Sequence, residues 1–513
     1  MTNKVPSRAF VCIGFMGAGK TTAARSIATA LNRPATDIDQ EIERRLGKPI
    51  AQIFAQDGEP AFRHAEEEVT LELLDDPRTA AVSLGGGAVA SQAIRQALAH
   101  HPVIWLDVDL DTAWARAQGS GRPLARDRAT FEALHAEREP LYASLADAIV
   151  PAARSATMAP VLDALRGMPA GARMVWASSA SGDYPVYIGA GILLERRFWP
   201  PSVDGRRFLV TDGRVGQLYG DVIEPVAGRV TVMPGEQSKT VAHAEIVWTE
   251  LLRAGVNRDD LVVALGGGVV GDLAGFCAAT YQRGVRYVQV PTTLVAQVDS
   301  AYGGKTGVDL EEAKNYVGAY HQPVAVIADT STLATLPAEE VAAGYAEVVK
   351  TALIAGGDLW ERVRSGAEPT DPEVIMACAR AKLAVVALDE RDEGLRQVLN
   401  LGHTVAHAIE TATGYARYRH GEAVALGLLA ALRLSERDDL RHEVESLLAA
   451  HGLPTMLTGA DPDDVVRATA RDKKRRGEGP VPFVLVDAPG AVRPGCPVDG
   501  DALAAAVREL GEP

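Results

Sequence analysis

Cysteine is scarce in this sequence, and its four cysteines lie far apart along 513 residues, at Cys12, Cys277, Cys378 and Cys496. They form neither CxxC pairs nor the closely spaced framework of a disulfide-stapled domain, which favours a reducing compartment. Long apolar runs are missing as well, since none approaches the ~18 residues of a membrane span, and no signal-peptide pattern opens the sequence. We therefore expect a cytoplasmic protein with no membrane partner.

Positive charge is in deficit. The sequence has 52 Lys and Arg residues against 67 Asp and Glu, a formal net charge of -15 and a pI near 5.3. Such a protein repels a phosphate backbone, so we expect no nucleic-acid partner, and any phosphate group that it binds must meet a local positive pocket. The 47% share of hydrophobic residues is ordinary for a globular protein. The length suggests about three domains.

A phosphate-binding motif stands near the N-terminus. A strand pattern over residues 9–13 runs into GFMGAGKTT at residues 14–22, and a helical pattern follows over residues 23–31. In this context GxxxxGK[ST] binds a nucleoside triphosphate, because the glycines turn N–H groups toward phosphate oxygens, the lysine reaches the β- and γ-phosphates and the hydroxyl meets Mg²⁺. The residues expected to bind ATP with Mg²⁺ are Gly14, Gly17, Gly19, Lys20, Thr21 and Thr22.

The residues that follow this loop are candidates for binding the phosphoryl acceptor. Asp37 and Asp39 alternate at the end of a predicted strand, so both carboxylates face one side, where one suits Mg²⁺ and the other suits a substrate hydroxyl. Downstream stand Phe62-Arg63, a triple-glycine turn that follows a strand pattern over residues 80–84, GSGRPL at residues 119–124 and REPLY at residues 138–142.

Together these motifs resemble shikimate kinase across nearly the whole of residues 1–168. The resemblance implies a P-loop kinase domain with a parallel sheet, which transfers a phosphoryl group by positioning and charge neutralisation. It implies that Asp39 orients or deprotonates the attacking hydroxyl, while Lys20 and Arg122, the latter on a mobile lid, act on the ATP phosphates. The residues that it implies hold shikimate are Asp39, Arg63, Gly85, Gly86, Gly87 and Arg138.

From about residue 150 to residue 182 the pattern weakens into Pro, Ala, Ser and Gly, with one short helical piece at residues 159–165. We place a linker at residues 169–182. The predicted domains are residues 1–168, a Rossmann-like α/β domain at 183–336, and a mostly helical domain at 337–513.

A second glycine motif begins after the strand pattern at residues 261–265. Gly266, Gly268 and Gly271 form GxGxxG between a strand and a helix, which indicates a dinucleotide pyrophosphate at the helix N-terminus. No acidic residue follows at the end of the next predicted strand, residues 287–290, to hold a ribose. Asp212 and Glu236, upstream of the motif, are the candidates for that contact if NAD binds.

Three histidines cluster between residues 396 and 422. His403 and His407 are spaced i, i+4 on a predicted helix over residues 405–411, so they share one face, as a metal pair or a metal ligand beside an acid/base group requires. His420 follows, and Glu347 supplies a carboxylate. A Glu, His, His set with open positions suits a divalent metal that polarises a hydroxyl or carbonyl. The spacing leaves open which histidines bind it.

The segment from residue 212 to residue 486 resembles 3-dehydroquinate synthase, an NAD- and zinc-dependent cyclase, on PTT at residues 291–293, DSAYGGKTGVD at 299–309, GYAEVVK at 344–350 and GHTVAHA at 402–408. The resemblance implies Zn²⁺ or Co²⁺ on Glu347, His403 and His420, with His407 catalytic. It implies NAD contacts from Lys239, Gly268, Asp272, Thr292, Thr293 and Thr335. It implies a substrate pocket, with catalytic roles among its members, built from Asp299, Lys305, Lys314, Asn315, Lys350, Lys382, Arg396, Asn400 and one of Lys473 and Lys474.

Two further expectations follow from this resemblance. Arg283 matches an arginine that reaches the phosphate pocket of the neighbouring subunit, which implies a homodimer. The family usually has GHTxGHA, whereas Ala406 replaces the second glycine here, an added methyl that removes no functional group. We expect no loss of activity from it.

The two halves predict one bifunctional enzyme of the shikimate pathway. One half phosphorylates shikimate with ATP, and the other cyclises 3-deoxy-D-arabino-heptulosonate 7-phosphate to 3-dehydroquinate and phosphate, with NAD taking and then returning a hydride. The alternatives are another sugar-phosphate cyclase of the inosose or valiolone type, a polyol dehydrogenase, a non-catalytic nucleotide sensor in the N-terminal half, and an unrelated P-loop module fused to an NAD-binding scaffold. Retention of Asp39, Arg63 and Arg138 disfavours the sensor.

Overall fold

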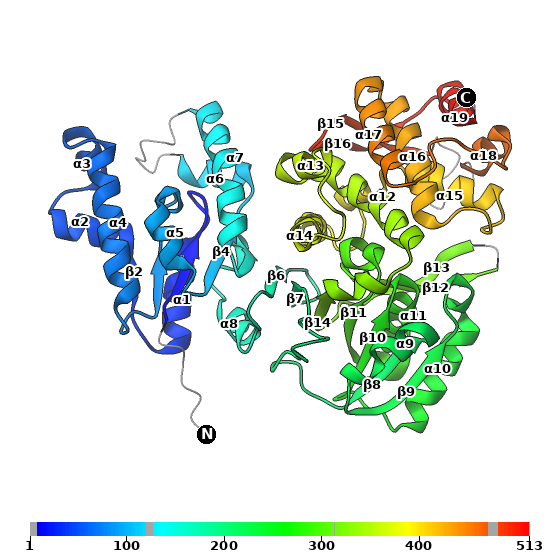
Figure 1. Cartoon of the computed structure of the whole chain (residues 1–513), viewed down its shortest axis with the longest axis horizontal. Coiled ribbons are helices and arrows are strands. Elements are labelled where there is room, and N and C mark those ends of the chain that lie inside the picture. Colours follow the sequence, from blue (N-terminus) through cyan, green and yellow to red (C-terminus); the bar gives the residue numbers. More distant parts are fainter. Residues whose placement is uncertain (1–7, 119–126, 312, 470–480, 512–513) are drawn as a thin grey trace. The chain divides into compact units, whose positions relative to one another are not determined.

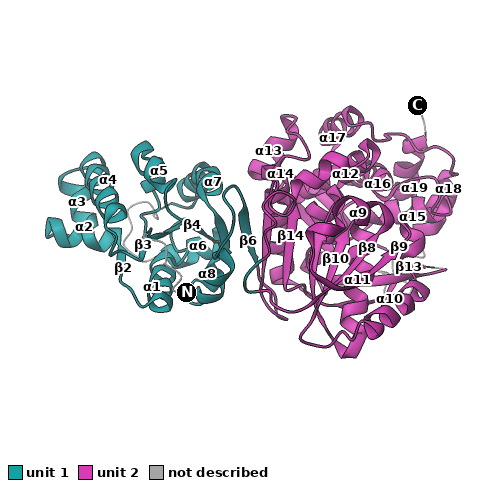
Figure 2. Ribbon diagram, turned by 60° about the horizontal axis from the view of Figure 1, so that its bottom comes forward, with its two compact units in different colours: residues 1–176, 200–202 teal, residues 177–199, 203–513 magenta. Residues whose placement is uncertain are grey.

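The computed structural model describes residues 8–118, 127–311, 313–469 and 481–511. It contains two compact units (Figure 2): one comprises Met1–Trp176 and Pro200–Ser202, and the other comprises Ala177–Trp199 and Val203–Pro513. The stretch predicted as a linker, residues 169–182, includes the strand β6 (Arg173–Ala177). Among the described residues, no helix is both long and apolar enough to cross a membrane.

The first unit is a parallel sheet in the order β2-β3-β1-β4-β5-β6. Its central strand β1 (Phe10–Ile13) is buried at every residue, as a strand covered on both faces must be. The other strands are β2 (Ala35–Asp37), β3 (Ala81–Ser83), β4 (Val103–Asp107) and β5 (Ala148–Pro151). The helices are α1 (Lys20–Leu31), α2 (Ile38–Leu46), α3 (Ile50–Gln56), α4 (Glu59–Asp75), α5 (Gln92–Leu98), α6 (Leu110–Ala117), α7 (Arg128–Leu145) and α8 (Ala159–Leu165).

One local prediction in this unit is wrong. Asp37 ends β2, but Asp39 lies in the first turn of α2 and not on the strand beside it. The reason is that the Asp37 carboxylate accepts a hydrogen bond from the Gln40 amide at 3.2 Å and so caps the helix. The helix α1 also begins earlier than predicted, at Lys20.

The second unit opens with another parallel sheet, in the order β7-β14-β11-β10-β8-β9. Its strands are β7 (Tyr184–Gly189), β8 (Arg207–Asp212), β9 (Val226–Val232), β10 (Leu261–Gly266), β11 (Arg286–Pro291) and β14 (Ala325–Asp329). Val262 and Ala264 of β10 pack in one apolar cluster with α10 (Val241–Arg253) and α11 (Gly268–Thr280). Helix α9 (Gly213–Tyr219) follows β8, and the hairpin β12 (Lys305–Leu310) and β13 (Ala313–Tyr320) completes this part.

The rest of the second unit is mostly helical (Figure 1, yellow-green to red). Its helices are α12 (Ala338–Ala355), α13 (Gly357–Arg364), α14 (Pro372–Leu388), α15 (His403–Ala412), α16 (His420–Leu434), α17 (Asp438–Ala450), α18 (Pro462–Thr469) and α19 (Gly500–Gly511). An antiparallel hairpin, β15 (Pro482–Ala488) and β16 (Ala491–Pro497), was not predicted. Helix α15 begins at His403, so it is longer than the predicted 405–411. The predicted fold class, a P-loop domain followed by an α/β domain and a helical domain, is confirmed.

Candidate active sites

The phosphate loop joins β1 to α1. Gly14, Gly17 and Gly19 all have positive φ, at 140°, 79° and 86°, a backbone conformation that favours glycine. Lys20 Nζ donates hydrogen bonds to the carbonyl oxygens of Gly14 and Phe15, each at 3.0 Å. The loop therefore curves around a lysine ammonium at the start of a helix, which fits the phosphates of a nucleoside triphosphate.

A hydroxyl and a carboxylate meet next to this loop. Thr21 Oγ1 donates to Asp37 Oδ2 at 2.5 Å and lies 3.5 Å from Ser83 Oγ. Oxygen ligands of this kind suit Mg²⁺ bound together with phosphates. Thr22, the next residue of α1, is exposed.

The predicted shikimate residues converge on the glycine turn after β3. A Cβ atom at Gly85 would lie 3.3 Å from Asp39 Oδ1, and one at Gly86 would lie 3.6 Å from Arg138 Nη1. One at Gly87 would lie 2.6 Å from both terminal nitrogens of Arg63. Arg63, Gly87 and Arg138 also line a cavity of about 310 Å³. A side chain at Gly87 would therefore collide with Arg63, and Arg138 lies beside Gly86 at ordinary contact distance. Two arginines next to one turn suit a small anionic substrate.

Sequence reasoning assigned no role to three further residues of this site. Glu66 is buried, and Arg63 Nη1 donates to its Oε2 at 2.6 Å, while its Oε1 has no partner among the described residues. Burial raises the pKa of Glu66, and Arg63 only partly offsets it. Tyr142 donates its hydroxyl to the Gly86 carbonyl, and Arg116 donates to the Gly17 carbonyl. The i, i+3 spacing of Arg63 and Glu66 was the available signal.

Glu347, His403 and His420, from α12, α15 and α16, form the candidate metal centre of the second unit. His403 Nε2 lies 3.5 Å from Glu347 Oε1, and His420 Nε2 lies 3.3 Å from the same oxygen. One ligand atom from each residue lies within 4.8 Å of the others. His407 is beside this trio, with its ring centroid 5.5 Å from that of His403 and 6.2 Å from that of His420. One carboxylate and two imidazoles fit a zinc ion with an open position.

The opposite ring nitrogens of the two candidate histidine ligands, His403 and His420, also have partners. His403 Nδ1 lies 3.1 Å from the Leu401 carbonyl oxygen, and His420 Nδ1 lies 3.5 Å from Glu410 Oε1. Partners of this kind leave Nε2 of each ring available for a metal. Burial by itself would raise the pKa of Glu410, but His420 and Lys314 outweigh burial and lower it to about 2. Glu410 was missed because only the fold brings it to His420.

Two buried lysines, Lys350 and Lys382, lie in a cluster of charged side chains with Glu347 and Asp299. Lys350 Nζ lies 2.5 Å from Glu347 Oε2 and 3.5 Å from Asp299 Oδ1. Lys382 Nζ donates to the Asp299 carbonyl oxygen at 2.7 Å and to Oδ1 at 2.9 Å. Burial lowers the pKa of Lys382 to about 8, although Asp299 acts in the other direction. Burial also opposes the charge of Lys350, but Asp299 and Glu347 raise its pKa.

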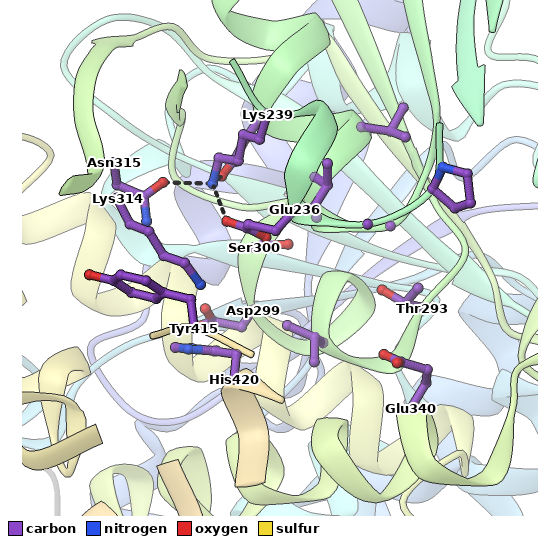
Figure 3. Close-up of a pocket in the computed structure, with 18 of the residues that line it drawn as sticks. Glu236, Lys239, Thr293, Asp299, Ser300, Lys314, Asn315, Glu340, Tyr415 and His420 are labelled. Atoms are coloured by element: carbon purple, nitrogen blue, oxygen red, sulfur yellow. Dashed lines mark hydrogen bonds and ion pairs between the residues drawn. The ribbon is translucent and has the colours of Figure 1, made fainter. Parts of the chain in front are cut away.

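A cavity of about 710 Å³ joins this cluster to the glycine motif (Figure 3). The predicted site residues that line it are Asp212, Glu236, Lys239, Gly268, Asp272, Thr292, Thr293, Asp299, Lys314, Asn315, Thr335, Glu347, His407 and His420. Lys239 Nζ donates to Asp272 Oδ2 at 2.5 Å and to Asn315 Oδ1 at 2.6 Å. Its ammonium therefore connects α11 to the hairpin β12–β13 inside the cavity.

The cofactor end of the cavity has the features that a dinucleotide needs. Gly268 begins α11, and no described side chain caps its first N–H groups. A Cβ atom at Gly268 would lie 2.9 Å from Ser300 Oγ, so the backbone alone can approach a ligand there. Asp212 accepts hydrogen bonds from two backbone N–H groups through Oδ1 and so caps α9. These residues fit a pyrophosphate on a helix N-terminus.

Both halves of the chain match models of known protein families. The shikimate kinase model covers residues 16–166, and the N-terminal and C-terminal models of 3-dehydroquinate synthase cover residues 229–343 and 344–475. The 3-dehydroquinate synthase of Symbiobacterium thermophilum is 44% identical over 335 residues, which are 60% of this chain and 92% of that protein. The enzyme of the same name from Halorhodospira halophila is also 44% identical, over 62% of this chain and 94% of that protein.

The chain belongs to the 3-dehydroquinate synthase family. It carries a shikimate kinase domain ahead of the synthase, and the predicted pair of activities is confirmed.

Solved structures agree with the fold of the synthase unit. A 2-deoxy-scyllo-inosose synthase complexed with carbaglucose-6-phosphate, NAD⁺ and Co²⁺ is 26% identical with a TM-score of 0.58, over 66% of this chain and 100% of that one. The 2-epi-5-epi-valiolone synthase of Streptomyces hygroscopicus, with NAD⁺ and Zn²⁺ bound, is also 26% identical with a TM-score of 0.58, over 64% and 96%. Both relatives hold the dinucleotide and a divalent metal.

The predicted residues Lys305, Arg396, Asn400 and Arg283 are not among those that line the cavity of about 710 Å³. Lys305 of β12 is exposed and pairs with Asp392. Arg396 is 1% exposed, and its guanidinium donates to the carbonyl oxygens of Gly303 and Glu390. Asn400 ends the short helix before the histidines, and Arg283 is exposed in the turn between α11 and β11. Arg122, Lys473 and Lys474 lie outside the described residues.

Proposed function

We propose that the kinase unit binds ATP with Mg²⁺ and phosphorylates shikimate through the residues predicted above. Lys20 neutralises the transferring phosphate, while Thr21 and Asp37 hold Mg²⁺. Arg63 and Arg138 bind the shikimate carboxylate, and the Asp39 carboxylate orients the attacking hydroxyl. The assignment is supported by the glycine turn, because all three of these charged side chains lie where a side chain on the turn would point.

We propose that the synthase unit converts 3-deoxy-D-arabino-heptulosonate 7-phosphate to 3-dehydroquinate and phosphate with NAD and zinc. The observation that carries this is the single cavity of about 710 Å³, which contains the Gly268 helix end, two metal ligands and the pocket residues Lys314 and Asn315. Bound NAD⁺ would accept and return a hydride, and a bound zinc ion would polarise the hydroxyl being oxidised.

The side chains of the synthase unit supply positioning and proton transfer. Glu347, His403 and His420 would hold zinc, and Co²⁺ fits the same donors. Lys350 and Lys382, pinned by Asp299, present ammonium groups to an anionic substrate. His407 lies beside the metal ligands and lines the cavity, so it can exchange a proton with the substrate. Lys305 and Arg396 are further substrate residues in this proposal.

A sugar-phosphate cyclase of the inosose or valiolone type is the second candidate for this unit, because solved relatives of those types share its fold. Identity favours the first candidate, since those relatives are 26% identical and the dehydroquinate synthases 44%. We also propose a homodimer through the synthase unit, supported by the exposed position of Arg283, and a cytoplasmic location, supported by the free buried cysteines Cys12, Cys277 and Cys378.

Two assays on the full chain test the proposal. With NAD⁺ and Zn²⁺, the heptulosonate phosphate should yield equal amounts of phosphate and dehydroquinate, and ATP with shikimate should yield shikimate 3-phosphate. Phosphate release from a hexose or heptulose phosphate that gives an inosose or a valiolone, with no dehydroquinate, would transfer the assignment to the second candidate. Lys20→Ala should abolish the kinase reaction and leave the synthase reaction unchanged, so each half serves as the control for the other.

A further inference from the structure

Glu410 is a buried carboxylate next to the candidate metal centre that has no role in the reaction described above. Its side chain is 3% exposed. It lies on α15, three residues after His407 and seven after His403, so the three side chains share one face of the helix. A carboxylate buried this deeply requires partners of opposite charge or hydrogen-bond donors, because its desolvation is costly.

A single oxygen of Glu410 has two such partners. Oε1 lies 3.5 Å from His420 Nδ1 and 3.4 Å from Lys314 Nζ. His420 belongs to the metal-ligand trio, and Lys314 belongs to the wall of the substrate cavity. Lys314 also has its ammonium 4.7 Å from the centre of the Tyr415 ring. Figure 3 shows Lys314, Tyr415 and His420 together at this end of the cavity.

The two histidine ligands differ in what holds them. His403 has a neutral backbone carbonyl at Nδ1, whereas His420 has a carboxylate there. A carboxylate that accepts the Nδ1–H proton fixes the ring orientation and tautomer and increases the basicity of Nε2, the atom that faces Glu347. His420 is also the more exposed of the two ligands, at 40% of its side chain against 11%. Its ring therefore depends more on a specific partner for its position.

We propose that Glu410 is a positioning residue with two partners: it fixes the imidazole of His420 as a metal ligand and, through the same oxygen, holds Lys314 at the wall of the substrate pocket. Metal binding and the position of the pocket lysine then each depend on one buried carboxylate. Only the identity of the substrate in this inference rests on the proposed function.

Zinc affinity tests the first partner. The full chain is stripped of metal, and its zinc Kd is measured by competition with a chromophoric chelator. Glu410→Gln keeps the side-chain volume but loses the charge, and we expect its zinc Kd to rise about 10- to 100-fold. The absorption bands of the Co²⁺-loaded variant should also shift, because the geometry of a ligand changes. Glu245→Gln removes the same charge from an exposed position of α10, and its zinc Kd should equal that of the wild type.

Substrate affinity tests the second partner. Lys314→Met should raise KM for the heptulosonate phosphate and leave the zinc Kd unchanged. Glu410→Gln, assayed at saturating zinc, should also raise KM, and the double variant should show less than the product of the two single effects, because the lysine and the carboxylate are in contact. If the KM of the double variant instead rises by the full product of the two single effects, Glu410 does not hold Lys314 in place, and this part of the proposal is wrong.

A zinc Kd of Glu410→Gln within twofold of the wild type would overturn the proposal that Glu410 positions His420. If a second variant, Glu410→Ala, fails to fold, the zinc Kd of Glu410→Gln alone tests the proposal. If Glu410 has only a structural role, Glu410→Gln would lower the melting temperature of the metal-free protein without changing the zinc Kd or the Co²⁺ spectrum. The zinc measurement needs no substrate. Absence of dehydroquinate with wild-type enzyme would contradict the proposed function and leave the positioning of His420 standing.

Discussion

Replacing His403 should weaken zinc binding, whereas replacing His407 should lower kcat without affecting zinc binding. His403 has its Nε2 3.5 Å from Glu347 Oε1, inside the ligand trio, whereas His407 lies beside the trio and lines the substrate cavity. A zinc site built from several ligands gains about 3 kcal/mol from each, so His403→Ala should weaken zinc binding on the order of a hundredfold. His407→Ala should leave zinc binding unchanged and lower kcat about 10²- to 10⁴-fold, the usual contribution of a general acid or base.

Equilibrium dialysis at a free zinc concentration about tenfold above the wild-type Kd resolves these two cases. The wild type and His407→Ala should each hold about 0.9 zinc per chain, and His403→Ala about 0.1. Phosphate release then gives kcat for the loaded forms. His442→Ala is the control, because His442 is exposed on α17 and its Nδ1 lies 2.6 Å from the Asp438 carbonyl oxygen of the same helix. Stoichiometric loss of zinc in His407→Ala would refute the reasoning and make His403 and His407 the metal pair.

Three other outcomes are expected. Gly87→Ala should raise KM for shikimate about 10- to 100-fold, the value of a charge-assisted hydrogen bond, because its Cβ displaces the Arg63 guanidinium; unchanged KM would contradict this. The synthase kcat/KM should fall as pH rises through about 8, where the Lys382 ammonium becomes neutral, and Lys382→Met should lack this step. Ala406→Gly should lower the free energy of unfolding of the synthase unit by about 1–2 kcal/mol in urea, because a buried helical methyl is lost; a gain in stability would contradict it.

Contiguous motifs were predictable because their chemistry is local. In the segment at residues 14–22, strand, glycines, lysine and threonine adjoin, so the phosphate loop forms wherever the strand and helix form. Gly268 at the start of α11 is predictable for the same reason. The order of the three domains also follows from periodicity and from family resemblance. Asp39 was misplaced because the cap made by Asp37 is a matter of hydrogen bonding and not of alternation.

The residues alone were thus enough to predict a phosphate loop, a dinucleotide-binding glycine motif, a set of one carboxylate and three histidines, and the family. The fold brings Glu347, His403 and His420 together as a candidate metal centre and places His407 at the cavity wall, and the residue spacing did not show this division. Glu347, His403 and His420 meet because α16 packs against both α12 and α15, and His407 lines the cavity in the same arrangement. The place of Glu410 between His420 and Lys314 was equally a product of folding. Burial and the distances between residues far apart in the chain shift the pKa of each group, and the spacing of residues along the sequence shows neither.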